Sequence, residues 1–304
     1  MGVGKTARES ALAYLAVLGT VIAAIAVRTS IAPGAGAPEA VEAHLQRELR
    51  VRVGAVLEWE RARRADVERI ADDAALRVRL AAMAQDGAPL DSAPLDALLG
   101  SACADLVGCT LSRPDGSVLG SYVGREVPPA LVRRAAQGRT VHSKLVATDA
   151  LGGLDPRAED ARFAVFFATP IIEGGEVRAV LTGRVKPDED LGAILGDRPP
   201  GRTGETYAVD PRGYMVTRSR FDAQGQHPSG APRVLGAPGT WLRTPTGVPT
   251  RPLAALQRSG VDVDGYRDYR GVRVVGAWRW LDDLGAGVVT EMDHAEAVRI
   301  ESSL

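Results

Sequence analysis

Aromatic and arginine side chains come close together in two parts of the sequence, in a combination that suits the binding of a small carboxylate. In the first part, Tyr122, Arg162 and Phe166 lie on or beside segments rich in strand-forming residues. The second part offers the same combination in Tyr207, Arg218, Arg220, Tyr266 and Tyr269. A guanidinium can hold a carboxylate through paired hydrogen bonds, beside an aromatic wall. The alternative is structural, because aromatic residues on strands are usually core and arginines are usually solvated. Both interpretations stay open for each residue.

Cys103 and Cys109 are the only two cysteines of the chain. Outside the cytoplasm they could close a small disulfide ring, for which the chain-entropy model predicts about 2 to 2.5 kcal/mol of stabilisation. The alternative is a pair of buried free thiols, since a helical Cys103 and a strand Cys109 could be placed too far apart to bond. We expect the disulfide.

The sequence predicts neither a metal site, nor a cofactor, nor an enzyme. His44, His142, His227 and His294 are scattered, and none lies at ligand spacing with a cysteine or another histidine. Residues 2–6, Gly-Val-Gly-Lys-Thr, lack the preceding strand and glycine of a phosphate-binding loop, and no Gly-x-Ser-x-Gly or His-Glu-x-x-His motif is present. A net charge of -1 without a basic stripe argues against a nucleic-acid partner.

A long helical pattern precedes these segments. Apolar residues recur at three- and four-residue steps from Leu45 to Val78, between the start signal at Pro38 and the stop at Gly87. One interpretation is a single stalk helix over residues 38–87 that spans two stacked modules and pairs with a second copy. The other is two ordinary helices broken near Gly54.

Two groups of strands follow the helical segment. Residues 95–195 predict a helix, then strand, strand, helix, strand, strand and strand, ending in a long hairpin over residues 163–185. Residues 201–297 repeat this outline, beginning with a hairpin that joins 207–209 to 214–217 through an Asp-Pro-Arg-Gly turn. We therefore expect an α+β fold with two tandem PAS-like antiparallel-sheet modules.

The first thirty residues predict a membrane anchor. The uncharged 18-residue run over 10–27 gives about 27 Å of helix, enough to cross a bilayer core. Lys5 and Arg8 precede it, so the positive-inside rule places residues 1–9 in the cytoplasm, residues 10–28 in the membrane and the rest outside. Cleavage after Ala24-Ile-Ala26 is the alternative, although the run is longer than a signal-peptide core.

Three phrases of the second strand group resemble one sensor family. They are residues 201–210, Gly-Arg-Thr-Gly-Glu-Thr-Tyr-Ala-Val-Asp; residues 219–221, Ser-Arg-Phe; and residues 269–277, Tyr-Arg-Gly-Val-Arg-Val-Val-Gly-Ala. With the anchor and the long helix, they resemble the double-Cache sensors of bacterial receptors and kinases over residues 38–297. The resemblance implies an inner-membrane protein whose periplasmic modules, distal over 95–195 and proximal over 201–297, sense a small molecule and signal through the stalk helix.

Two departures from the family pattern matter. The amino-acid-binding members carry an Arg-x-Trp-Tyr arrangement in the distal module, whereas this chain has no tryptophan between Trp59 and Trp241, so an amino-acid ligand is unsupported. The chain also ends at Leu304, where a typical member continues into a second membrane helix, so we expect either a truncated sensor or a separate output protein. A membrane-anchored periplasmic hydrolase and a passive scaffold protein remain the alternative functions.

Overall fold

A computed structural model describes residues 37–86, 93–124, 127–147, 163–221, 239–255 and 257–302. The segments predicted to be cytoplasmic, 1–9, and membrane-spanning, 10–28, lie outside these ranges. Within the ranges, no helix combines the length and the apolar character that a bilayer crossing requires. The membrane anchor therefore stays a prediction from sequence.

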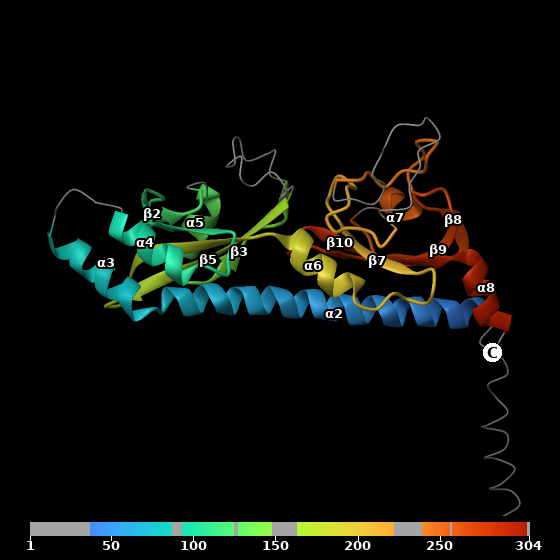
Figure 1. Cartoon of the computed structure of the whole chain (residues 1–304), viewed down its shortest axis with the longest axis horizontal. Coiled ribbons are helices and arrows are strands. Elements are labelled where there is room, and N and C mark those ends of the chain that lie inside the picture. Colours follow the sequence, from blue (N-terminus) through green and yellow to red (C-terminus); the bar gives the residue numbers. More distant parts are fainter. Residues whose placement is uncertain are drawn as a thin grey trace, which may run out of the picture.

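Helix α2 (Ala37–Ala71) runs beneath the whole molecule (Figure 1). Its 35 residues span about 50 Å, and its buried stripe includes Val41, Leu45 and Val56. The helix continues through Gly54, where packing against both sheets outweighs the roughly 1 kcal/mol that a helical glycine costs. The alternative interpretation, two helices broken near Gly54, is therefore wrong.

The long helix is interrupted at residues 72–73 instead, and helix α3 (Ala74–Asp86) follows. Asp73 begins α3 as its N-cap, because its carboxylate accepts a 2.9 Å hydrogen bond from the backbone N–H of Leu76. The helical pattern over 38–87 thus corresponds to two helices, of which only α2 spans the sheets (Figure 1).

The first sheet has six antiparallel strands in the order β2-β1-β6-β5-β3, with β4 also pairing to β5. The strands are β1 (Gly108–Ser112), β2 (Val118–Tyr122), β3 (Val141–His142), β4 (Val146–Ala147), β5 (Phe163–Glu173) and β6 (Glu176–Val185). The single strand expected between the second helix of this group and the hairpin over 163–185 is thus two short strands. It is interrupted because Leu145 leaves the first sheet. Its backbone N–H donates a 2.7 Å hydrogen bond to the carbonyl of Leu284, in the second half of the chain.

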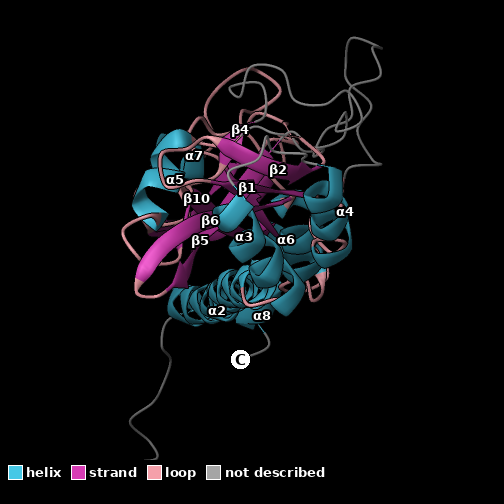
Figure 2. Cartoon of the chain, turned by 90° about the vertical axis from the view of Figure 1, so that its left-hand side faces the viewer, coloured by secondary structure: helices cyan, strands magenta, loops and turns pink. Residues whose placement is uncertain are grey.

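The two faces of the first sheet have different coverings. Phe163, Val165 and Phe167 of β5 join the core that includes the buried residues of α2 and of α4 (Ala93–Ala102). The alternate residues Ala164 and Phe166 pack instead with α5 (Pro129–Ala135). Figure 2 shows α2 beneath the strands and α5 to one side of them. The period of two along a strand therefore separates an α2 face from an α5 face.

The second sheet has four antiparallel strands in the order β7-β10-β9-β8. The elements here are α6 (Pro187–Gly196), β7 (Glu205–Val209), α7 (Arg251–Ala254), β8 (Gly260–Arg267), β9 (Arg273–Leu281), β10 (Ala286–Asp293) and α8 (His294–Ser302). Helix α8 lies at the end of the molecule where α2 begins (Figure 1). The strand expected over 214–217 is absent as a regular element. Its pairing with β7 is reduced to an isolated bridge between Val209 and Met215 and a 2.8 Å hydrogen bond from the Val216 N–H to the Ala208 carbonyl, because the Met215 N–H bonds instead to the Thr240 carbonyl.

Side chains of α2 fix the connecting helix α6 in place. The indole N–H of Trp59 donates a 2.7 Å hydrogen bond to Asp190 in the first turn of α6. At the other end, the buried guanidinium of Arg52 donates to the carbonyls of Ile194 and Arg198. Arg52 thereby satisfies carbonyls at the C-terminal end of α6. The expected mixed fold of helices and antiparallel sheets with a long N-terminal helix is confirmed.

Two turns of the second sheet share one construction, Asp-x-Arg-Gly. In each, one aspartate oxygen accepts the N–H groups of the second and fourth following residues, and the other accepts the arginine Nε. The glycines, Gly213 and Gly271, have φ values of 87° and 84°, a region that favours glycine. The turns differ in burial: the Arg212 side chain is 50% exposed and that of Arg270 only 17%.

Candidate functional site

A pocket opens on the α5 face of the first sheet. Its free volume is about 10 Å³, room for about one water molecule, and its walls include Thr110 of β1, Phe166 of β5, and Thr182 and Arg184 of β6. We call it the first-sheet pocket. Its polar residues share a face because Thr110 pairs directly with Thr182, and Arg184 pairs with Phe166. Two hydroxyls, a guanidinium and a phenyl ring are thus brought together by strand register.

The polar groups of this face are deeply buried. Arg184 is 6% exposed and Thr182 is 1% exposed. The hydroxyls of Thr182 and of Ser112, which lies on the same face of β1, have no hydrogen-bond partner among the described residues. An unsatisfied buried hydroxyl costs about 1 to 3 kcal/mol, so a bound molecule that supplies a partner would be favoured there.

Segment 122–124 borders the pocket in an uncommon conformation. Val123 has a φ of 51°, which costs a β-branched residue about 1 to 3 kcal/mol. The segment passes directly over Gly108, where an added Cβ would lie 2.3 Å from the carbonyl oxygen of Val123. The Thr110 hydroxyl donates a 3.3 Å hydrogen bond to the carbonyl of Gly124. Strain held in place by such contacts is typical of binding sites.

A disulfide joins Cys103, just beyond α4, to Cys109 of β1. Both residues are buried in the core on the α2 side. The bond ties the helix that packs on β2 to the strand that forms one wall of the first-sheet pocket. It therefore anchors β1 against a shift that would change the pocket.

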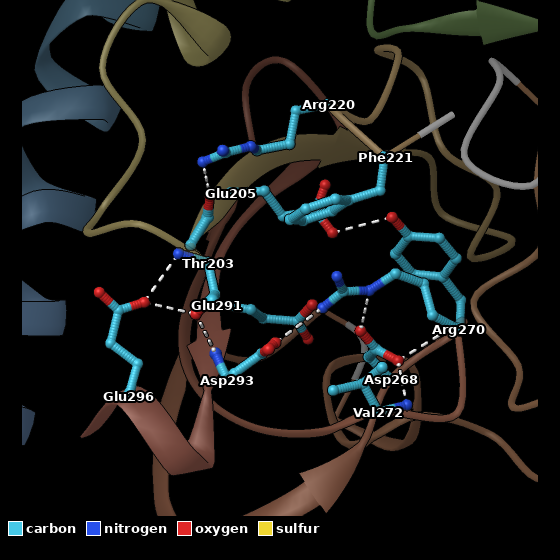
Figure 3. Close-up of polar contacts among 12 residues, drawn as sticks. Thr203, Glu205, Arg220, Phe221, Asp268, Arg270, Val272, Glu291, Asp293 and Glu296 are labelled. Atoms are coloured by element: carbon cyan, nitrogen blue, oxygen red, sulfur yellow. Dashed lines mark hydrogen bonds and ion pairs between the residues drawn. The ribbon is translucent and has the colours of Figure 1, made fainter. Parts of the chain in front are cut away.

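The second sheet carries a group of buried acids on its face away from α2. We call Glu205 of β7, Asp268 of the β8–β9 turn and Glu291 of β10 the carboxylate cluster (Figure 3). They are 3%, 0% and 1% exposed, and their carboxylate oxygens lie within 4.8 Å of one another. Three different elements bring these acids together.

Hydroxyl groups satisfy the two glutamates of the cluster. Glu205 accepts hydrogen bonds from the Ser219 hydroxyl and, at 2.8 Å, from the Tyr269 hydroxyl. Glu291 accepts from the hydroxyls of Tyr207 at 2.9 Å and of Tyr266 at 2.6 Å. Every oxygen of both glutamates thus already accepts from a side chain of this chain. We therefore assign no metal ion to the cluster.

The aspartate of the cluster is paired with arginine. Asp268 accepts a 2.6 Å hydrogen bond from Nε of Arg270, whose Nη2 lies 3.2 Å from Asp293 (Figure 3). The guanidinium lies over the ring of Phe221, 4.1 Å from its centroid. This cation–π contact gives Arg270 a third partner and holds it between the two aspartates.

Burial changes the acid–base properties of the cluster. Desolvation raises the pKa of Glu205 and of Asp268, and it raises that of Glu291 to about 8, with the negative charge of Asp268 as the next cause. Burial, followed by the charge of Glu291, also raises the pKa of Tyr207 and Tyr266. The tyrosines are therefore neutral hydrogen-bond donors.

The residues proposed from sequence fall in different places. Phe166 lines the first-sheet pocket, whereas Tyr122 packs on the α2 side of the sheet, next to Gly100 of α4. The structure brings Tyr207, Tyr266 and Tyr269 together at the carboxylate cluster.

Of the three arginines proposed from sequence, Arg218 and Arg220 lie outside both sites. Arg220 donates to the carbonyl of Gly204 at 2.8 Å and lies over Phe221, which indicates a structural role. Arg218 is exposed, and Arg162 lies outside the described residues.

Sequence reasoning missed the polar residues of both sites, namely Thr110, Ser112, Thr182, Arg184, Glu205, Asp268 and Glu291. A signal existed in the first sheet. Thr182 and Arg184 alternate with apolar residues along β6, which places a polar stripe on one face. In the second sheet, nothing in the sequence distinguished Glu205, Asp268 and Glu291 from acidic residues that face solvent.

The fold is similar to that of solved chemoreceptor domains, although no protein-family model matches the chain and no curated protein matches its sequence. The ligand-binding domain of the Campylobacter jejuni chemoreceptor Tlp3, in complex with 4-methylisoleucine, superposes with a TM-score of 0.54 at 12% identity, covering 86% of this chain and 94% of that chain. The chain has a double-Cache type of fold. The resemblance to that family inferred from sequence is confirmed at the level of the fold.

Two further chemoreceptor domains superpose less closely. The Pseudomonas fluorescens CtaA domain with L-isoleucine gives a TM-score of 0.48 at 14% identity, covering 86% of this chain and 96% of that chain. The Pseudomonas aeruginosa PctB domain with L-Arg gives 0.47 at 16% identity, covering 85% and 97%. The assignment of the double-Cache type of fold rests on the Campylobacter domain alone.

Proposed function

We propose that this chain is the extracytoplasmic ligand-sensing module of a bacterial membrane-anchored signalling protein. The first sheet is the membrane-distal PAS-like module, over 95–195, and the second is the proximal one, over 201–297. The observation that carries the proposal is the first-sheet pocket, where Arg184, Thr182 and Phe166 meet on a face of the sheet that is partly hollow.

The lining of the pocket indicates the chemistry of the ligand. A guanidinium and threonine hydroxyls donate hydrogen bonds, and a phenyl ring offers an apolar wall. The free volume of about 10 Å³ is that of one water molecule, so a larger ligand would have to displace the walls of the pocket on entering. We infer a small ligand with a carboxylate or another strong hydrogen-bond acceptor.

The route of the signal follows the helices. Pocket strands β5 and β6 contact α2, and Arg52 and Trp59 of α2 hold α6, which leads into the second sheet. Helix α8 contacts α2 at the opposite end (Figure 1). In this proposal residues 10–28 anchor the chain in the inner membrane, two copies pair through α2, whose Val51 is 59% exposed, and a separate protein provides the output.

A thermal-shift screen of the 304-residue chain in detergent tests the proposal. A small carboxylate at 100 times its Kd should raise the Tm by about 5 °C. Arg184→Met and Thr182→Val should abolish that shift. Arg178→Met on the same strand, where the side chain is 52% exposed, is the matched control and should retain it. Turnover of a screened compound would support the hydrolase alternative, and a broad panel without any shift would support the scaffold.

A further inference from the structure

The carboxylate cluster holds more negative charge than its partner can balance. Glu205, Asp268 and Glu291 lie within 4.8 Å of one another, and Asp293 is close by through Arg270. Among the described residues, the guanidinium that bonds to these acids is that of Arg270. Like charges at this separation in a buried site oppose simultaneous ionisation, so at least one acid retains a proton near neutral pH.

Glu291 lies at the centre of this arrangement. Its register partner across β7 and β10 is Glu205, so two buried carboxylates lie directly opposite each other. The titratable and charged groups that face it come from every neighbouring element: Glu205 and Tyr207 from β7, Tyr266 from β8, Asp268, Tyr269 and Arg270 from the β8–β9 turn, and Asp293 from β10 itself. The nearest groups to its carboxylate are thus phenols and acids, and not a cation.

We propose that Glu291 is a proton-binding site and that its protonation state controls how β10 holds helix α8. The proton exchanges with solvent. When Glu291 is ionised, both phenols donate to it; when it is protonated, its own O–H donates and one phenol accepts. The tyrosines thus adapt to both states without moving away, which allows the site to titrate in a folded protein.

The acid–base properties fit this role. The pKa of Glu291 is about 8, so the group titrates just above neutral pH, where an extracytoplasmic sensor would meet a changing environment. Ionisation adds a negative charge beside Asp268. The guanidinium of Arg270 is then drawn toward the cluster and away from Asp293, the residue directly before α8.

A short clamp connects the site to α8. The Thr203 hydroxyl accepts a 3.1 Å hydrogen bond from the N–H of Asp293 and donates to Glu296 in the first turn of α8 (Figure 3). Glu296 also accepts the N–H groups of Arg202 and Thr203, at 2.8 and 2.7 Å. Residues 202–203 lead into β7 and Glu205, so both strands that carry the facing glutamates end in the clamp. A change in their spacing therefore reaches α8 directly, independently of any ligand in the first-sheet pocket.

Infrared titration of the 304-residue chain in detergent tests the proton site. A protonated-carboxyl band should disappear with a midpoint near the pKa of about 8 and be absent in Glu291→Gln. Hydrogen exchange of the α8 amides, corrected for intrinsic rates, should become faster through the same pH range in the unsubstituted chain and stay constant in Glu291→Gln. Glu176→Gln, at an exposed carboxylate in the β5–β6 hairpin, is the control and should change neither result.

A second variant keeps the test informative if Glu291→Gln does not fold. Tyr266→Phe removes one donor to the ionised form, so the midpoint should move upward by roughly one pH unit. A carboxyl band that persists in Glu291→Gln, a midpoint unmoved in Tyr266→Phe, or α8 protection that is constant across the titration of the unsubstituted chain would overturn the inference.

Discussion

The two sheets differ in how the polar groups on the face away from α2 are hydrogen-bonded. In the first sheet, the hydroxyls of Ser112 and Thr182 have no partner among the described residues, and Arg184 lines a pocket. In the second, the carboxylate cluster fills the face, and Tyr207 and Tyr269 satisfy its oxygens. The first sheet therefore has hydroxyls that can still hydrogen-bond to a bound molecule, whereas the polar groups of the second sheet already bond to side chains of this chain. Similar architecture can therefore serve recognition in one place and internal control in another.

The largest loss of stability should come from removing an acid of the carboxylate cluster. Asp268→Ala leaves Arg270 without its closest carboxylate in a site where the arginine side chain is only 17% exposed. We expect a loss of about 3 to 5 kcal/mol in the free energy of unfolding. Asp210→Ala removes the same turn contacts from a 50% exposed Arg212 and should cost about 1 to 3 kcal/mol. Urea denaturation of both variants measures the difference, and equal losses would contradict the burial argument.

The pH dependence of stability should come mainly from the second sheet. The native pKa of Glu291, about 8, lies above its ordinary value of 4.5, so between these values the native state binds more protons than the unfolded chain. The contribution of Glu291 to stability is therefore complete below about pH 4.5 and is lost as the pH rises through 8. Melting curves from pH 6 to pH 9 should show the Tm falling by several degrees, and Glu291→Gln should flatten that slope. A slope unchanged in the variant would assign the effect to other groups.

Removing the disulfide should weaken the first sheet by a smaller amount. The double substitution Cys103→Ser with Cys109→Ser opens the small ring beside the pocket and should cost about 2 to 2.5 kcal/mol. Because Cys109 lies on β1, hydrogen exchange should increase in β1 and β2 more than in β7 and β10. Equal exchange in both sheets would show that the bond stabilises the whole molecule and not the pocket wall.

The smallest effect should be a gain in stability at the first-sheet pocket. Thr182→Val replaces a buried, unpartnered hydroxyl with a methyl group of similar volume, so stability should increase by about 0.5 to 1 kcal/mol. The equivalent replacement Thr206→Val in the second sheet breaks the hydroxyl pair of Thr206 and Thr290, 3.0 Å apart, and should be destabilising instead. A higher Tm for Thr182→Val with a lower Tm for Thr206→Val would support the comparison of the two sheets, and a lower Tm for both variants would contradict it.

The fold followed from sequence better than the sites did. Two long strand-forming runs on either side of the Gly-Gly turn at 174–175 were sufficient to predict the hairpin of β5 and β6, because the turn chemistry and the run lengths agree there. The segment 214–217 does pair with β7, through an isolated bridge and the Val216 N–H, but it is not a regular strand because the Met215 N–H bonds to Thr240 of a distant segment. Glu205 and Glu291 were missed because a carboxylate on a strand usually faces water, and only cross-strand pairing revealed that tyrosines cover them. Arg184 was missed although its alternation with apolar residues along β6 already placed it on a polar stripe.

The central claim is that a small molecule binds in the first sheet and not in the second. Thermal shift of the 304-residue chain with its best small-carboxylate ligand, compared between Arg184→Met and Tyr266→Phe, tests that claim most directly. The account predicts that Arg184→Met loses the ligand-induced shift, whereas Tyr266→Phe, which alters only the carboxylate cluster, keeps it. Loss of the shift in Tyr266→Phe together with its retention in Arg184→Met would contradict the account and would place the ligand at the second sheet.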